Sequence, residues 1–282
     1  MKEISSRSNP LWRDWMHQRS VAGRPGNLIW LDGEHLCQAW LAKRGQPLWA
    51  IFDQSKMDSP HFLTLRQQID PARQVIMPSA LFDQLVTVKT AQGILFLVEH
   101  AMTLTSPVHA VSQAEAEANS FASNAVEFER AVMLDSIQDP GNLGTILRLS
   151  AAFGVSHVIL GSGCAAVWSP KVLRSAQGAH FAMTLIEVDD LADWLHAYRQ
   201  AVTDSALVLA TAVVDAESLG SVRLPQRSIW LFGHEGQGVS PQLLKMADVK
   251  VNISHDQTVV DSLNVASAAA ICLYEQSRQN SL

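Results

Sequence analysis

The strongest constraint on the fold is a regular alternation of apolar strand-like segments and helix-like segments between residues 131 and 276. Strand-like runs such as Val-Ile-Leu at 158–160 and Leu-Val-Leu-Ala at 207–210 are continuously apolar. Continuous apolar runs are typical of strands that are buried on both faces of a sheet. Because helices connect consecutive strands, the strands are expected to run parallel. This half of the chain therefore predicts an α/β domain with a parallel sheet covered on both faces.

The individual elements follow from the same patterns. In the second half we expect strands at 131–134, 157–160, 184–188, 207–210, 229–232 and 249–253, and helices at 142–153, 171–176, 191–201, 241–246 and 263–276. The first half alternates as well, with a capped helix from Ser8, strands at 28–31, 48–52, 74–77 and 94–98, and helices at 34–42, 61–68 and 81–85. A Ser-, Ala-, Glu- and Asn-rich stretch separates the halves. We expect a smaller α/β domain at 1–105, a linker at 106–128 and a larger domain at 129–282.

Composition limits the class of protein. Apolar residues make up 48% of the chain and charged residues 17%, as in packed globular proteins. The net charge of −6 means that any contact with nucleic acid must come from local patches. One candidate patch lies in the first 25 residues, although a solvated basic end explains it equally well. Its basic residues are Lys2, Arg7, Arg13, Arg19 and Arg24.

Targeting and metal signals are weak. The N-terminus lacks the apolar stretch of a secretory signal, and the longest apolar runs are about half of what a membrane span needs. We therefore expect a cytoplasmic protein without membrane contact. Cys37, Cys164 and Cys272 are scattered and lack CxxC spacing, so we expect buried thiols and no metal site.

The first segment with chemical potential runs from Asp139-Pro140-Gly141 into a helix that starts near Asn142. Arg148 is the only charged residue in this long apolar helix. A lone arginine in such surroundings needs a partner. The residues alone leave two explanations open, a structural salt bridge with Asp135 or Asp139 and a place in an active site.

Two later segments also follow strands. Gly233, Gly236 and Gly238 lie just after an apolar strand, where main-chain amides could reach a ligand, although an ordinary tight turn explains them too. They do not form a dinucleotide-binding fingerprint. Before the last helix, a polar loop offers Asp261 or Ser262 as N-cap, with Asn264 in the first turn. A plain capped core helix is the alternative explanation for that segment.

Together, the order and spacing of the segments resemble the SpoU (TrmH) family of RNA ribose methyltransferases in the SPOUT superfamily. The matching stretches are Asp139-Pro-x-Asn-Leu-Gly-x-x-x-x-Arg148, Ser169-Pro-Lys-Val-Leu-Arg-Ser-Ala-Gln-Gly-Ala179, Leu231-x-Gly-x-Glu-Gly-x-Gly-Val-Ser240 and Ser262-Leu-Asn-Val-Ala-x-Ala268. More loosely, residues 8–94 are similar to the L30e-like RNA-binding domain that often precedes the catalytic domain.

The resemblance implies a SPOUT domain with a deep trefoil knot that holds S-adenosylmethionine, a homodimer formed through the catalytic domain, and methyl transfer to a ribose 2′-hydroxyl of ribosomal or transfer RNA. It implies catalytic roles for Asn142, Arg148, Glu235, Ser262 and Asn264, and cofactor contacts around Gly233, Gly238, Ile253 and Leu263. Residues 254–261 depart from the family's usual loop, which is shorter and contains Pro and Gly.

Three other functions are alternatives to this one. A non-enzymatic RNA-binding protein could keep this fold, but intact motif residues speak against it. A SPOUT enzyme could methylate a base, whereas the pair Asn142 and Arg148 favours ribose. A nucleotide oxidoreductase would need a phosphate-binding fingerprint that the chain lacks. Because a guanidinium stays charged near neutral pH, we expect Arg148 to clamp a phosphate rather than to accept a proton.

Overall fold

The computed structural model describes residues 1–20, 28–57, 59–86, 92–99, 103–105, 128–202, 204–256 and 258–280. Nearly all of the expected linker at 106–128 lies outside these residues. By packing, the chain divides into two compact units, Met1–Ala101 with Ala166–Phe181 and Met102–Ala165 with Ala182–Leu282. The domain limits drawn from the sequence, 1–105 and 129–282, stay a prediction.

The first unit contains a mixed five-stranded sheet in the order β1-β4-β3-β5-β2. Its strands are β1 (Lys2–Glu3), β2 (Ile29–Asp32), β3 (Trp49–Asp53), β4 (Gln74–Met77) and β5 (Ile94–Val98). Its α-helices are α1 (Pro10–Ser20), α2 (Glu34–Arg44), α3 (Pro60–Gln67), α4 (Ser79–Leu85) and α8 (Pro170–Ala176), and short 3-10 turns lie at Gln54–Lys56 and Pro71–Arg73. Trp15, Ile51 and Phe82 are buried in its core. The strands and helices expected between residues 8 and 98 are confirmed.

The second unit contains an eight-stranded sheet in the order β11-β13-β10-β12-β7-β8-β9-β6, and every neighbouring pair is parallel. Its strands are β6 (Thr103–Thr105), β7 (Arg130–Leu134), β8 (His157–Gly161), β9 (Thr184–Val188), β10 (Leu207–Thr211), β11 (Glu217–Ser218), β12 (Ser228–Phe232) and β13 (Val249–Asn252). Its α-helices are α7 (Pro140–Ala152), α9 (Leu191–Ala201), α10 (Pro241–Met246) and α11 (Val265–Asn280), and a 3-10 turn at Ala179–Ala182 lies where the chain returns from the first unit to the second.

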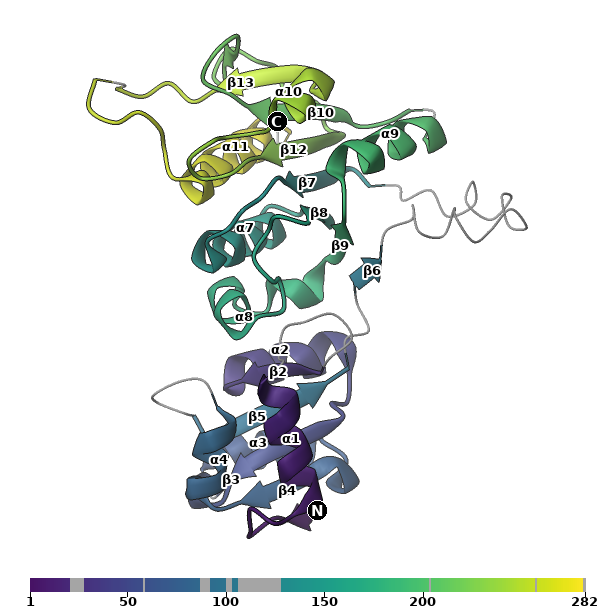
Figure 1. Ribbon diagram of the computed structural model, residues 1–282, viewed down its shortest axis with the longest axis vertical. Helices are drawn as coiled ribbons and strands as arrows, with labels where there is room; N and C mark the ends of the chain where they lie inside the picture. The colour runs from purple at the N-terminus through teal and green to yellow at the C-terminus, as the bar shows by residue number, and fades with distance from the viewer. Residues whose placement is uncertain are drawn as a thin grey trace. The chain divides into compact units, whose positions relative to one another are not determined.

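The parallel sheet predicted from the continuous apolar runs is confirmed (Figure 1). Strands β1, β6 and β11 were not predicted, because two or three residues are too few to show a period.

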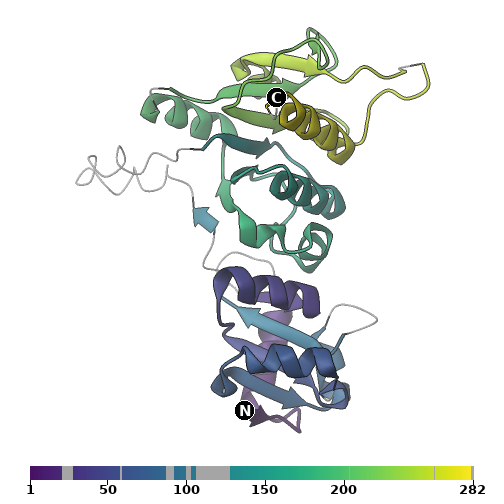
Figure 2. The ribbon, with the colours of Figure 1, turned by 180° about the vertical axis from the view of Figure 1, so that it is seen from behind.

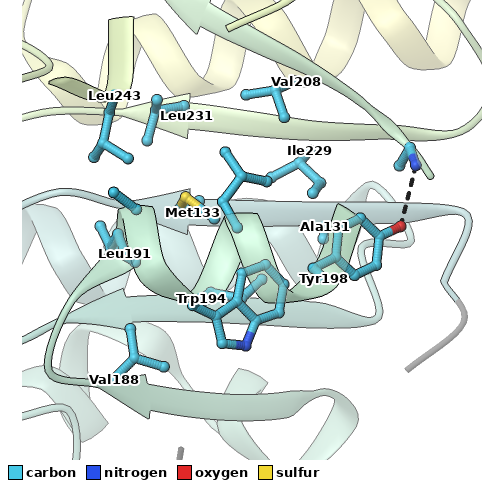
Figure 3. Close-up of a cluster of buried hydrophobic side chains, with 14 of the residues drawn as sticks. Ala131, Met133, Val188, Leu191, Trp194, Tyr198, Val208, Ile229, Leu231 and Leu243 are labelled. Atoms are coloured by element: carbon cyan, nitrogen blue, oxygen red, sulfur yellow. Dashed lines mark hydrogen bonds between the residues drawn. The ribbon is translucent and has the colours of Figure 1, made fainter. Parts of the chain in front are cut away.

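Helices cover both faces of this sheet, as expected. On one face, Leu191, Trp194 and Tyr198 of α9 and Leu243 of α10 pack on Met133 and other strand side chains (Figure 3). The Tyr198 hydroxyl accepts a hydrogen bond from the Ala206 amide at 3.1 Å.

On the other face, α11 packs beside α7 (Figure 2), and the Trp230 indole of β12 donates to Gln276 of α11 at 2.7 Å. Among the described residues, none of the helices is both long enough and apolar enough to span a bilayer.

Candidate active site

Two loops that leave neighbouring strands are tied together at one edge of the parallel sheet. β7 ends at Leu134 and pairs in register with β12, which ends at Phe232. The Asp135 amide donates to the Phe232 carbonyl at 2.9 Å, and the Asp135 carboxylate accepts from the Ser240 amide at 2.8 Å. In a parallel sheet this carboxyl edge is where ligands bind. The parallel pairing thus brings the first and second motifs to one place.

Glu235, which belongs to the second motif, holds the first motif in place through hydrogen bonds. Its Oε1 accepts from the Asp139 amide at 3.0 Å and from Nδ2 of Asn142 at 3.1 Å, and its Oε2 accepts from the Gln138 amide at 3.3 Å. Partial burial alone raises the pKa of Glu235, but the hydrogen bonds led by that of Asn142 outweigh burial, and the pKa is lowered. Glu235 is therefore a carboxylate that accepts hydrogen bonds at neutral pH.

Asn264 connects the third motif to the first. Its Nδ2 donates to Oδ1 of Asn142 at 3.0 Å. Its Oδ1 accepts from the amides of Ala266 and Ser267, which makes it the N-cap of α11. The prediction that Asp261 or Ser262 caps this helix is wrong, because α11 starts at Val265 rather than at Leu263. Asn142, Glu235 and Asn264 thus form one hydrogen-bonded chain, which we call the amide–carboxylate cluster.

Arg148 and Ser262 are both exposed. Arg148 lies on α7, and no ion pair that involves it is found in the described part of the chain. Asp135, one of the two partners considered for it, bonds the Ser240 amide instead. A structural salt bridge therefore does not explain Arg148, and its guanidinium is accessible to a ligand.

A cavity of about 360 Å³ opens beside the cluster. All four residues expected near the cofactor, Gly233, Gly238, Ile253 and Leu263, line it, together with Glu235 and Ser262 of the expected catalytic set. Asn142, Arg148 and Asn264 are not part of its lining.

The cavity depends on glycine at position 233. A Cβ added to Gly233 would lie 2.2 Å from the Gly238 carbonyl carbon and 2.2 Å from the Val239 nitrogen. Gly238 itself has a φ of 72°, and its amide donates to the His234 carbonyl at 2.8 Å. Only glycine at position 233 permits this close approach, and glycine at position 238 adopts the left-handed conformation without strain.

Two further lining residues, Asn252 and His255, were not among the candidates drawn from the sequence. Both carry a buried polar atom without a hydrogen-bond partner within the described residues, Oδ1 of Asn252 and Nε2 of His255. The available signal was the unusual loop at 254–261, which includes His255, but its sequence does not show which atoms face a ligand.

Residues 129–274, more than half of the chain, match the SpoU rRNA methylase family. The chain belongs to this family. This chain is 28% identical to an uncharacterized tRNA/rRNA methyltransferase of Synechocystis sp., and the match covers 98% of this chain and 93% of the relative. It is 27% identical to the 23S rRNA (guanosine(2553)-2′-O)-methyltransferase RlmP of Bacillus subtilis, over 97% of this chain and 98% of that one.

The fold also has a solved counterpart. The AdoMet-bound rRNA methyltransferase from Sinorhizobium meliloti superposes on this SpoU protein with a TM-score of 0.77 at 22% identity, and the match covers 100% of this chain and 98% of the other. The predicted α/β fold with a parallel sheet is thereby confirmed, and the match of residues 129–274 confirms the family. The SpoU protein is accordingly an RNA methyltransferase, and the oxidoreductase alternative is excluded.

Proposed function

We propose that this SpoU protein transfers a methyl group from S-adenosylmethionine to the 2′-hydroxyl of a ribose in ribosomal RNA. The observation that carries the proposal is the amide–carboxylate cluster, which joins all three motifs beside the cavity. The Bacillus subtilis relative, named as a 23S rRNA 2′-O-methyltransferase, supports ribose in ribosomal RNA as the target. The AdoMet-bound enzyme from Sinorhizobium meliloti supports the choice of cofactor.

The cavity suits this cofactor in size and chemistry. Its volume of about 360 Å³ falls in the range of small-molecule sites. Val251, Leu263 and Val265 offer apolar walls, and the buried acceptors of Asn252 and His255 offer hydrogen bonds. When bound there, the cofactor supplies an electrophilic methyl group on a sulfonium.

The residues around the cavity position the ribose hydroxyl that accepts the methyl group, and they stabilise the negative charge that develops on its oxygen. Methyl transfer needs the hydroxyl oxygen in line with the methyl group, so orientation supplies much of the catalysis. We assign that orientation to Asn142, Glu235, Ser262 and Asn264. The exposed guanidinium of Arg148 binds an RNA phosphate through a bidentate pair of hydrogen bonds and stabilises the negative charge that develops on the ribose oxygen.

We further propose a homodimer formed through the catalytic domain. Ile271 and Tyr274 on α11 are 40% and 58% exposed, which is unusual for large apolar side chains on a packed helix. A second copy of the chain would cover them. Sedimentation of the wild-type protein and of a variant with both residues changed to Ser tests this state, and a wild-type monomer at micromolar concentration contradicts it.

The remaining architecture is also proposed from the family. Residues 1–105 bind the RNA substrate, in the cytoplasm, and the C-terminal segment forms a trefoil knot. In support of the knot, Gln279 near the end of α11 accepts from the Leu224 amide at 2.9 Å and donates to the Val222 carbonyl at 3.1 Å. The chain's end is thereby held against the segment that precedes β12.

The deciding experiment is to delete the gene and map the lost 2′-O-methyl positions across ribosomal and transfer RNA. Purified protein and labelled cofactor should then restore the methyl group on unmodified RNA, and nuclease digestion with mass spectrometry should locate it on ribose. A methyl group on the base would favour base methylation. RNA binding without cofactor binding or methyl transfer would favour a non-enzymatic role.

A further inference from the structure

The wall of the cofactor cavity at the end of β13 carries two hydrogen-bond acceptors that have no partner among the described residues. They are Oδ1 of Asn252, the last residue of β13, and Nε2 of His255, three residues further on. Both atoms are buried, and both residues line the cavity. Buried polar atoms in folded proteins nearly always have a partner. A ligand that enters the cavity is the available source of one.

The hydrogen bond on the other ring nitrogen fixes what His255 can accept. Its Nδ1 lies 2.7 Å from the Ile253 carbonyl oxygen, which can only accept. Nδ1 therefore carries the proton, and in the neutral ring Nε2 presents a lone pair. The Asn252 amide oxygen is likewise an acceptor. The partner that both atoms need is a group with N–H or O–H donors.

We propose that Asn252 and His255 recognise the exocyclic amino group of the cofactor's adenine and so select adenosine over other nucleosides. This inference rests on the proposed function. The amino group is neutral and has two N–H donors, which matches two neutral acceptors. The cofactor's ammonium group would find a better partner in the carboxylate of Asp261, which belongs to the same lining.

The test compares three ligands by titration calorimetry on the full-length protein. S-adenosylhomocysteine has the amino group, S-inosylhomocysteine has an oxygen in its place, and 5′-methylthioadenosine keeps the adenine but lacks the amino-acid end. His255→Asn retains a donor for the Ile253 carbonyl and removes the acceptor at Nε2. Asn252→Leu keeps the shape and removes the oxygen. Val259→Ala, an exposed change in the same loop that does not line the cavity, is the control.

Wild-type protein should bind S-adenosylhomocysteine at least about tenfold more tightly than S-inosylhomocysteine. Each acceptor variant should lose about fivefold to tenfold affinity for S-adenosylhomocysteine and for 5′-methylthioadenosine, which is the worth of one net hydrogen bond. Its affinity for S-inosylhomocysteine should change less than twofold, and Val259→Ala should match wild type for all three ligands.

Equal wild-type affinity for the adenosyl and inosyl ligands overturns the inference, whatever the variants do. The inference is also overturned if the variants lose the same affinity for the adenosyl and the inosyl ligand. It is overturned as well if the variants keep wild-type affinity for 5′-methylthioadenosine, because the lost contact would then be to the amino-acid end. Failure of the proposed function looks different, because wild-type protein would then not bind S-adenosylhomocysteine at all. Unfolding midpoints of each variant identify any general loss of structure.

Discussion

The side chain of Asn264 donates to the side chain of Asn142 at 3.0 Å, although the two residues are 122 positions apart in the chain. Nδ2 of Asn142 in turn donates to Oε1 of Glu235 at 3.1 Å. Two members of the cluster also fix main-chain segments, since Asn264 caps α11 and Glu235 accepts from the amides of the loop before α7. The cluster is therefore both a structural clamp and the core of the proposed active site, and substitutions can separate these two roles.

Asn264→Asp should separate capping from catalysis. A carboxylate still accepts from the Ala266 and Ser267 amides, so stability should change by less than about 0.5 kcal/mol. It cannot donate to Asn142, so methyl transfer should fall at least about tenfold. Asn264→Ala should lose both functions and cost about 1 kcal/mol of stability. Urea unfolding and methyl incorporation measure the two effects, and full activity in Asn264→Asp contradicts the proposed role.

Glu235→Gln should reduce turnover more than cofactor binding. The side-chain amide of Gln keeps one acceptor oxygen. Its N–H group, however, would face main-chain N–H donors that bond the carboxylate in the wild-type protein. The loop before α7 should loosen, with kcat lower by about tenfold to a hundredfold. Calorimetry with S-adenosylhomocysteine should show a change of less than about threefold. An equal loss in both measurements would instead make Glu235 a cofactor-binding residue.

Arg148→Ala should strongly reduce methyl transfer and leave the fold intact. The side chain is exposed and has no ion pair among the described residues, so the unfolding free energy should stay within about 0.5 kcal/mol of wild type. Loss of its stabilising charge should cost about 100-fold in kcat. Arg148→Lys should retain part of the activity if charge alone matters. Unchanged activity in Arg148→Ala would remove Arg148 from the mechanism.

Gly233→Ala should close the cavity proposed to hold the cofactor. The added methyl group would meet main-chain atoms of Gly238 and Val239 at 2.2 Å, and these cannot move without opening the loop. We expect at least about a tenfold loss of affinity for S-adenosylhomocysteine. Gly220→Ala is the matched control, because no atom lies within 4 Å of its added carbon. Wild-type affinity in Gly233→Ala would mean that the loop adopts another conformation in solution.

Buried His180 should make folding sensitive to mild acid. Burial lowers its pKa from 6.5 to about 4, although the bond to the Val167 carbonyl at 2.8 Å opposes this. The unfolded state therefore binds the proton more readily, and the stability present above pH 6.5 is lost as the pH falls toward 4.

At pH 5 the loss from His180 should be about 2 kcal/mol relative to pH 7. His180→Gln keeps a donor for Val167 without a titrating ring. Urea unfolding of both proteins at pH 7 and pH 5 gives the difference that belongs to His180. A wild-type protein that loses no more stability than the variant would show that the ring is not buried as a neutral base.

The sequence by itself determined the alternation of strands and helices, the parallel sheet of the second unit and the three motifs with their family. Continuous apolar runs and helix signals are local, so they can be read without knowing which segments become neighbours. The same local logic assigned the cap of the last helix to Asp261 or Ser262. There it failed, because the end of a helix also depends on what its first residues contact.

Only the tertiary structure decided which side chains meet. The pairing of β7 with β12 brings Glu235 to Asn142, and the packing of α11 beside α7 brings Asn264 to the same place. It also showed that Arg148 is exposed rather than paired, and that acceptors of Asn252 and His255 line the cavity. Strand order and loop conformation set these relations, and hydrophobic periodicity carries no information about contacts between residues that are distant in the sequence.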